Sequence, residues 1–389
     1  MLSRARPAIP LSEPELGGRE WEYVKQCLDT GWVSSAGSFV GRFEREVAQR
    51  VQVPWAVATV NGTAALHLAL RVAGVEPDDE VLVSDLTFIA PANAVRYLGA
   101  WPVFLDAEPD YAQLDPDAVA AFLERNCERS GPCPRDRRTG RWVRALLPVD
   151  ILGHPVDLDP LLELCAAWGL ALVEDATESL GARYKGVPVG SRAGLACLSF
   201  NGNKIITTGG GGMILASRQD WADRARHLST QAKDDPVEFV HGAVGYNYRL
   251  SNVLAAIGTA QLERLDSFLE RKRSLSERYD AALADVPGIV PLGQAPWAES
   301  SRWLYTVLVD EARFGMDSRD LLHRLEAAGI QARPLWQPMH LSPAHRDCAA
   351  APCPNAARLH RRALCLPSSV GLTEADQERV VETIRAART

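Results

Sequence analysis

The first 250 residues alternate between two patterns of apolar positions. Short apolar runs predict buried strands, and these lie at 53–60, 80–84, 101–106, 144–150, 170–175, 197–200 and 213–217. Apolar residues at helical spacing separate several of these strands, as in the helices predicted at 61–74 and 158–169. Strands that alternate with helices indicate an α/β domain, in which helices cover both faces of a mainly parallel sheet.

Two further segments of this half have their own patterns. Amphipathic helices are predicted at 19–30 and 38–51, and a polar turn at 31–37 separates them. Residues 124–143 are rich in charge and broken by glycine and proline, which is typical of a surface excursion such as a hairpin.

The pattern changes after residue 250. The predicted elements are a long helix at 251–284, short strands near 302–309 and 330–335, and a helix at 318–328. They indicate a smaller α+β domain. A chain of 389 residues also exceeds the size of one ordinary hydrophobic core. We therefore predict a large domain over 1–250 and a small C-terminal domain over 251–389.

The composition narrows the functional classes. Apolar residues make up 47% of the chain and charged residues 23%, as in globular proteins. The formal net charge of −7 argues against a general affinity for nucleic acid or for anionic membranes. No apolar run approaches the roughly 18 residues of a membrane span, and the N-terminal segment lacks the apolar stretch of a secretion signal. We therefore expect a cytoplasmic protein.

The eight cysteines do not follow a metal-binding pattern. None has C-x-x-C spacing, and the pairs Cys127/Cys133 and Cys348/Cys353 lack histidines at zinc-ligand spacing. We expect reduced thiols and no metal site.

Lysine is rare, so any chemistry that needs a primary amine has few candidates. Lys25 and Lys272 lie on predicted amphipathic helices, and Lys185 and Lys233 lie in polar turns. Lys204 lies between two predicted buried strands, where an ammonium is costly to desolvate unless it is bound. A Schiff base with an aldehyde binds it and leaves it as a proton shuttle. The four glycines after it are equally consistent with a flexible surface loop.

Asp175 is the second chemical candidate. It follows four apolar residues, which places a carboxylate at the C-terminal end of a parallel strand, where α/β folds gather their ligands. Pyridoxal phosphate needs such a carboxylate to keep its pyridine nitrogen protonated. The alternative is an aspartate that caps the next helix.

Two weaker signals precede Asp175 in the chain. The turn Asn-Gly-Thr at 61–63 runs from a predicted strand into a helix, and its backbone N–H groups and the Thr63 hydroxyl suit a phosphate. Taken alone, this turn is better explained as an ordinary helix cap. Phe88 follows another strand end and could stack on a planar heterocycle, although a single phenylalanine is usually a core residue.

The order of these features resembles a known family. A phosphate turn, an aromatic residue, an aspartate and a lysine with a serine five residues ahead of it are similar to the DegT/DnrJ/EryC1/StrS sugar aminotransferases, which are fold-type I pyridoxal phosphate enzymes. The similar motifs are NGTAALHLAL, TFIAPANAV, VEDATESLGA, SFNGNK and VGYNYRLSN. GWVSSAG, FNGNKIITTGGGG and RPLWQPMH resemble the LegC-like branch, which makes 4-amino-6-deoxy nucleotide sugars for legionaminic acid and bacillosamine.

The resemblance implies a role for each matching residue. Lys204 carries the cofactor, Asp175 pairs with the pyridine nitrogen, and Phe88 covers the ring. The residues expected to contact the cofactor are Gly62, Thr63, Ala64, Phe88, Asp175, Glu178, Ser199, Asn201, Lys204 and Asn247. Of these, Asn247 is expected from the partner subunit of a homodimer with shared active sites. Many members have Gln or His where this chain has Glu178, which leaves the role of that carboxyl group open.

The substrate implied by the LegC-like branch is a nucleotide-linked 4-keto-6-deoxy-N-acetylhexosamine, aminated at C4 with glutamate as donor. The segments flanking the pocket supply the candidate contacts, which are Trp32, Ser34, Ser35, Arg249, Arg333, Trp336 and His340. Trp32 and the two serines suit a sugar, and the loop at 333–340 suits a base and a diphosphate. Tryptophan and proline in these segments could instead close a domain interface. Other functions weighed are amination of another keto sugar, a sugar 3-dehydratase, which Lys204 argues against, and a binding protein without cofactor.

Overall fold

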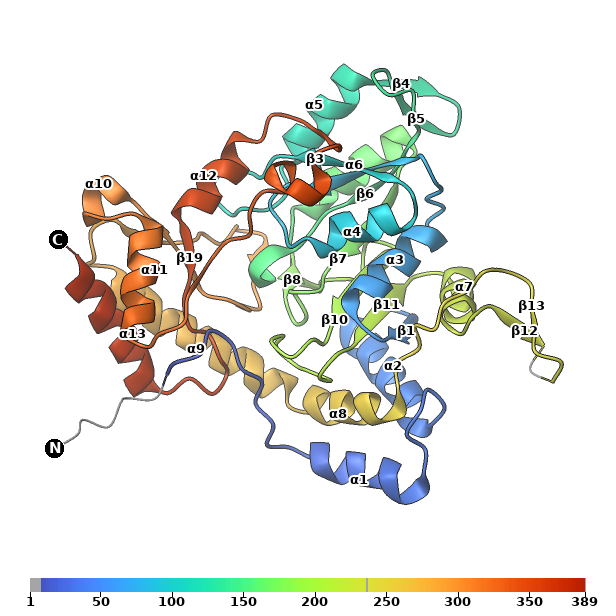
Figure 1. Cartoon of the computed structure of the whole chain (residues 1–389), viewed down its shortest axis with the longest axis horizontal. Helices are drawn as coiled ribbons and strands as arrows, with labels where there is room; N and C mark the ends of the chain where they lie inside the picture. Colours follow the sequence, from blue (N-terminus) through green and yellow to red (C-terminus); the bar gives the residue numbers. More distant parts are fainter. Residues whose placement is uncertain (1–7, 236, 389) are drawn as a thin grey trace.

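The computed structural model describes residues 8–235 and 237–388, and an eight-stranded sheet forms its centre (Figure 1). In spatial order its strands are β1 (Trp55–Thr59), β11 (Gly212–Ala216), β10 (Leu195–Ser199), β7 (Ala171–Asp175), β6 (Val143–Leu147), β2 (Glu80–Ser84), β3 (Trp101–Leu105) and β18 (Ala349–Ala350). β11 is antiparallel to both of its neighbours, and the other adjacent pairs are parallel. The predicted mainly parallel sheet is confirmed.

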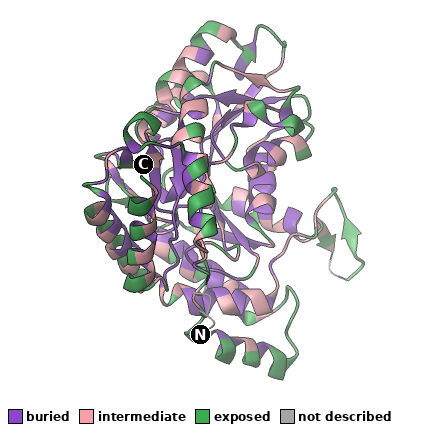
Figure 2. Ribbon diagram, turned by 60° about the vertical axis from the view of Figure 1, so that its left-hand side comes forward, coloured by how far each residue is buried: buried purple, intermediate pink, exposed green. Residues whose placement is uncertain are grey.

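Helices bury both faces of this sheet, because its strands carry apolar residues on both sides. Val81 and Val83 of β2 face a core shared with α3 (Gly62–Val72), α4 (Ala90–Tyr97) and α7 (Gln219–Ser229). Leu82 between them faces the opposite core, which it shares with α5 (Pro116–Asn126) and α6 (Leu158–Trp168). Further along that face lie α2 (Ser38–Val51) and α8 (Asn252–Leu262), with α1 (Glu20–Thr30) outside them. Figure 2 shows the buried strands between the partly exposed helices.

The charged excursion at 124–143 contains the hairpin that its sequence predicts. β4 (Cys127–Ser130) and β5 (Cys133–Asp136) pair in antiparallel fashion. A second hairpin, β12 (Lys233–Asp235) with β13 (Val240–His241), projects from the body of the molecule after α7 (Figure 1).

The prediction of one continuous helix at 251–284 is wrong, because the helix is interrupted. The structure divides it into α8 and α9 (Leu265–Leu283), and Arg264 between them has φ −105° and ψ 0°. Glu263 and Arg264 at this break bond to the N-terminal segment, Glu263 to the Tyr23 hydroxyl and Arg264 to Glu15. The apolar pattern continues through the break, so it could not reveal it.

The C-terminal part of the chain builds a second, four-stranded sheet. Its order is β14 (Ile289–Pro291), β16 (Thr306–Val309), β19 (Ala363–Cys365) and β17 (Arg333–Pro334). The helices of this part are α9, α10 (Glu311–Phe314), α11 (Ser318–Ala327), α12 (Pro354–Arg362) and α13 (Glu374–Ala387). α9 joins the two cores, because Phe268 packs in the core of the large sheet and Tyr279 in that of the small one. The domain boundary at residue 250 stays a prediction.

Two short pairings tie the C-terminal part to the large sheet. β18 extends the edge of the large sheet beside β3. β15 (Ala298–Glu299) pairs with β8 (Arg183–Tyr184), which also pairs with β9 (Val187–Pro188). In the described ranges no helix is both long and apolar enough to cross a membrane. Residues 1–7, which begin the N-terminal segment without the apolar stretch of a secretion signal, lie outside the described ranges.

Candidate active site

A cleft of about 330 Å³ lies where the parallel strands end. β1, β2, β6, β7 and β10 all point their C-terminal ends toward it, which is where ligands bind in open α/β sheets. It is lined by Asn61, Gly62, Thr63, Leu66, Thr87, Phe88, Ala90, Pro91, Val149, Asp175, Thr177, Glu178, Ser199, Asn201, Asn203, Lys204, Trp303 and Trp336. The volume lies in the range of small-molecule sites.

Asp175 is the last residue of β7 and is only 1% exposed. Its Oδ1 accepts a hydrogen bond from Thr177 N–H at 3.1 Å. Residues 176–181 form turns and no helix begins there, so the alternative role as a helix cap does not apply. Burial raises the pKa of Asp175, while its bonds to Thr177 and the charge of Lys204 act in the opposite direction.

Lys204 lies in the turn-rich segment between β10 and β11, and its side chain is 13% exposed. Its Nζ is 3.5 Å from Glu178 Oε1 and 4.0 Å from the ring centroid of Trp303. The glycines at 209–212 do not make this segment a free surface loop, because Gly212 begins the buried strand β11. The amine therefore sits in the cleft between a carboxyl group and an aromatic face.

Glu178 is buried beside the lysine. Its Oε2 accepts the Leu152 N–H at 2.9 Å, which orients the carboxyl group. Burial raises the pKa of Glu178 to about 7, although Lys204 and the Leu152 N–H oppose the shift. With this pKa, Glu178 changes between a neutral and a negatively charged group near neutral pH.

The N-terminus of α3 forms the opposite side of the cleft. Asn61 caps the helix, since its Oδ1 accepts the Ala64 N–H at 2.7 Å, so the helix-cap interpretation of this turn is confirmed. The backbone N–H of Ala64 is therefore already hydrogen-bonded within the chain. Gly62 packs against Ser199, and a Cβ at Gly62 would lie 2.9 Å from Ser199 Cβ. The close approach brings a hydroxyl to a helix N-terminus, which favours an anion.

Two further observations test whether pyridoxal phosphate fits. Thr87 Oγ1 borders the cleft and is buried without a hydrogen-bond partner among the described residues. Phe88, next to it, is 51% exposed, so it is not the core residue that its apolar character suggested as the alternative. One cleft thus holds a carboxyl group, an amine, a helix N-terminus beside a hydroxyl that suits an anion, and an exposed aromatic ring. The residues present fit this cofactor.

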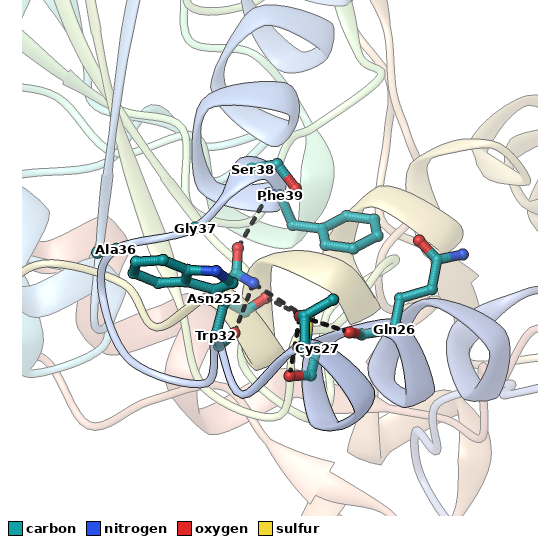
Figure 3. A pocket seen from close by; sticks show the side chains of 9 residues that line it. Gln26, Cys27, Trp32, Ala36, Gly37, Ser38, Phe39 and Asn252 are labelled. Carbon is teal, nitrogen blue, oxygen red and sulfur yellow. Dashed lines mark hydrogen bonds between the residues drawn. The ribbon is translucent and has the colours of Figure 1, made fainter.

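Three of the predicted substrate residues lie in a different place. Trp32 borders a separate cleft of about 460 Å³ between α1, the turn at 31–37 and α8 (Figure 3). Asn252 holds this turn, because its Nδ2 donates to Trp32 O at 2.7 Å and its N–H donates to Ser34 O at 2.6 Å. Ser34 and Ser35 are exposed. Within one chain, the structure does not bring Trp32, Ser34 or Ser35 to the first cleft.

Asn247 and Arg249 also lie outside the first cleft. Asn247 is exposed and forms a β-bridge with Thr230. Arg249 bonds through Nη1 to Glu44 and to Ala58 O, so its guanidinium is engaged near the end of β1. Neither residue contacts this chain's own cleft in the part of the chain that the structure describes.

The three candidate residues of the loop at 333–340 lie in different surroundings. Trp336 borders the first cleft, whereas Arg333 is exposed and lies 3.7 Å from Glu326. His340 bonds to buried Asp85, through its Nδ1 at 2.7 Å and its N–H at 2.8 Å. Cys353 completes a group whose possible ligand atoms lie within 4.8 Å, but both carboxylate oxygens already bond to His340. His340 thus anchors the loop.

Sequence reasoning missed several residues of the cleft, among them Asn203, Trp303 and Thr87. Thr87 is the first residue of the motif TFIAPANAV, directly before Phe88, so that motif could have indicated its place at the cleft. Trp303 lies about a hundred residues after Lys204, and no local pattern marks it.

The chain matches the DegT/DnrJ/EryC1/StrS aminotransferase family over residues 14–385. It belongs to this family. It is 39% identical over 384 residues to EpsN of Bacillus subtilis, which is described as a pyridoxal phosphate-dependent aminotransferase, and the alignment covers 97% of this chain and 95% of EpsN. It is 39% identical over 385 residues to the GDP-perosamine synthase of Caulobacter vibrioides, with 97% and 98% covered.

A solved structure agrees with both relatives. DesV of S. venezuelae, in complex with a ketimine intermediate, superimposes with a TM-score of 0.87 at 32% identity, and 98% of each chain is covered. The protein is therefore a sugar aminotransferase of the DegT/DnrJ/EryC1/StrS family that uses pyridoxal phosphate. Its membership of the LegC-like branch stays a prediction.

Proposed function

We propose that this aminotransferase aminates C4 of a nucleotide-linked 4-keto-6-deoxy-N-acetylhexosamine, with glutamate as the amino donor. The observation that carries the reaction type is the meeting of Lys204, Asp175 and the N-terminus of α3 around one cleft. The catalytic residues alone do not select a substrate. The sugar is therefore argued from the flanking residues and from the resemblance to the LegC-like branch.

Pyridoxal phosphate supplies an electron sink for the carbon that carries the amino group. Lys204 would hold the cofactor through Nζ, and the same amine would serve as the proton carrier of the reaction. Asp175 would pair with the pyridine nitrogen of the cofactor and would keep that nitrogen protonated. Because Asp175 is 1% exposed, water does not screen this interaction.

The remaining residues of the cleft bind and orient the cofactor. Gly62, Thr63 and Ser199 hold the phosphate with backbone N–H and hydroxyl groups, and Phe88 covers the ring face. The side chain of Asn201 donates to Asn203 Oδ1 at 3.3 Å, which keeps it beside the phosphate end of the cleft. The backbone N–H of Ala64 does not donate to the phosphate in this arrangement, because it already donates to Asn61 Oδ1.

Glu178 receives a role from its geometry. With a pKa of about 7 and an Oε1 3.5 Å from Lys204 Nζ, Glu178 changes its own charge beside the lysine nitrogen near neutral pH. The Gln or His of other family members lacks this combination of charge and proton affinity. We propose that Glu178 in its charged form holds a positive nitrogen beside it and in its neutral form donates a hydrogen bond.

The active unit is proposed to be a homodimer with shared sites. Asn247 is exposed and is not among the described residues that line the first cleft of its own chain, which suits a residue that acts on the partner's cofactor phosphate. Trp32, Ser34 and Ser35 lie on an exposed turn and suit the same arrangement toward the partner's substrate. A two-fold axis makes both exchanges reciprocal.

One relative favours a second candidate substrate. The Caulobacter vibrioides relative is a GDP-perosamine synthase, which favours a GDP-linked sugar over the UDP- or dTDP-linked alternatives. The cleft itself offers Trp336 and Trp303 as an aromatic wall.

The test is a panel of UDP-, GDP- and dTDP-linked 4-keto-6-deoxy sugars, each with and without an acetamido group at C2, incubated with glutamate and the loaded enzyme. Mass spectrometry and NMR of the products then identify the carbon that gains the amine. Amination at C4 of an acetamido sugar supports the proposal, and amination of the GDP-linked sugar alone supports the second candidate. Turnover of free α-keto acids without activity on any nucleotide sugar, or activity on 3-keto sugars only, would overturn both.

A further inference from the structure

A tryptophan from the C-terminal part of the chain lies against the nitrogen of Lys204. Trp303 is 3% exposed, and its ring centroid is 4.0 Å from Lys204 Nζ. The face of an indole ring attracts a positive charge at this distance. Glu178 Oε1 lies 3.5 Å from the same nitrogen. Two groups from different parts of the chain therefore favour a positive charge at that atom.

We infer that Trp303 is a further active-site residue, whose indole face stabilises the protonated state of the Lys204 nitrogen, and that Lys272 positions this indole. The inference rests on the proposed role of Lys204 as the residue that carries the cofactor.

Hydrogen bonds at both ends of Trp303 fix the orientation of its ring. Its Nε1–H donates to Asn203 O at 2.7 Å, which ties the indole to the backbone one residue before Lys204. Its carbonyl accepts from Lys272 Nζ at 2.7 Å. The ring of Trp336 lies nearly parallel to it, at 11° and with 6.5 Å between centroids. The indole therefore has little freedom to leave the lysine.

Lys272 is an unusual anchor because it is itself buried. It lies on α9, is 2% exposed, and donates to Ser368 O as well as to Trp303 O. The ion pairs found among the described residues do not include it, and burial lowers its pKa to about 7. A buried amine that bonds only to carbonyl groups is costly. Its two acceptors are brought together by the loop before β16 and by residue 368, so Lys272 joins these segments behind the cleft.

The two neighbours of the Lys204 nitrogen respond differently to pH. The charged groups that face it among the described residues are Glu178 and Asp175. Glu178 loses its negative charge as the pH falls through about 7. The attraction of the indole face does not depend on a titrating group, so Trp303 continues to favour the positive nitrogen when Glu178 is neutral.

The experiment titrates the visible absorbance band of the bound cofactor with pH and records the midpoint in the loaded enzyme. We expect Trp303→Leu to lower the midpoint by about one pH unit, and Trp303→Phe to lower it by less, since a phenyl face attracts cations more weakly. Lys272→Met keeps the indole but removes its anchor, and we expect a smaller decrease than for Trp303→Leu. Trp297→Phe is the matched control, because Trp297 is another tryptophan of the C-terminal part that contacts Tyr111 and does not border the cleft, and its midpoint should stay at the wild-type value.

An unchanged midpoint in Trp303→Leu would overturn the inference while leaving the proposed function intact. If that variant does not fold, as judged by circular dichroism and gel filtration, Trp303→Phe and Lys272→Met decide in its place, and wild-type midpoints in both overturn the inference. A wild-type protein in which borohydride fixes no cofactor to Lys204 overturns the proposed function and this inference together.

Discussion

Replacing Asp175 by asparagine tests the electrostatic contribution that the cleft makes to catalysis. The substitution keeps the shape of the side chain and removes its negative charge. Asp175 is 1% exposed, and an asparagine oxygen can still accept the Thr177 N–H that now bonds to Oδ1 at 3.1 Å. The variant therefore changes the charge facing the pyridine nitrogen with little change in packing.

The size of the effect follows from burial. Two opposite unit charges about 4 Å apart attract each other by about 4 kcal/mol at an effective dielectric constant of about 20. Removing one oriented electrostatic contact from an active site typically lowers kcat by about 100- to 1,000-fold. Because Asp175 is fully enclosed, we expect Asp175→Asn to lower the rate of the half-reaction with glutamate at least about a hundredfold.

The assay is stopped-flow absorbance of the bound cofactor after mixing with glutamate, at cofactor concentrations that saturate each variant. Asp150→Asn is the control, because Asp150 is buried in the same region and does not border the cleft. Its carboxylate accepts the Val156 N–H and the Ser179 hydroxyl, so we expect it to affect stability more than rate. A near-normal rate in Asp175→Asn would show that another group protonates the nitrogen. An equal loss of rate in both variants would show that the effect comes from removing either buried carboxyl group, Asp175 or Asp150, and not from the charge that faces the pyridine nitrogen.

Three further predictions concern the lysine, its neighbour and the partner subunit. Lys204→Ala should abolish transamination yet still bind pyridoxamine phosphate in equilibrium dialysis, and reductive fixing of the cofactor to another lysine would contradict the assignment. Burial raises the pKa of Glu178 from 4.5 to about 7, so the folded state binds this proton more tightly than the unfolded state, and the free energy of unfolding should fall as the pH rises from about 4.5 to about 7. Urea unfolding of cofactor-free Glu178→Gln should lack this contribution, which is at most about 3 kcal/mol, and an unchanged pH profile would refute it. Inactive Lys204→Ala and Asn247→Ala chains, unfolded and refolded together, should regain activity in their hybrids, and the absence of any rescue would argue against shared sites.

The parts of the site that could be predicted are those placed by the parallel sheet. Asp175 ends a predicted strand, Thr63 and Phe88 each follow one, and the C-terminal ends of parallel strands meet at one edge. Local apolar patterns were therefore enough to bring these side chains together. The pairing of strands was not needed, because each of these strands ends at the same edge whichever neighbour it has.

The parts that could not be predicted depend on how distant segments pack. Trp303 reaches the cleft because β15 pairs with β8 and because its carbonyl meets Lys272, and neither contact leaves a trace in the local sequence. For Arg333 and His340 the substrate contact stays a prediction, because their chemistry suits a nucleotide while their partners within the chain are Glu326 and Asp85. A residue type indicates what a side chain can bind and not which group it meets.

The lysines show where elimination by sequence pattern succeeds and where it fails. Lys25 and Lys185 are indeed exposed and pair with surface carboxylates, Asp29 and Asp159. Lys272 was set aside with them because it lies on a predicted amphipathic helix, and this pattern did not reveal that its side chain is buried, at 2% exposure. Burial alone therefore does not single out the cofactor-bearing lysine. The distinction lies in the surroundings, because Lys272 meets only backbone carbonyls behind the cleft, whereas Lys204 borders the cleft itself. An amine that must react needs an open approach, and of Lys204 and Lys272 only Lys204 borders the cleft, with Glu178 Oε1 3.5 Å from its nitrogen.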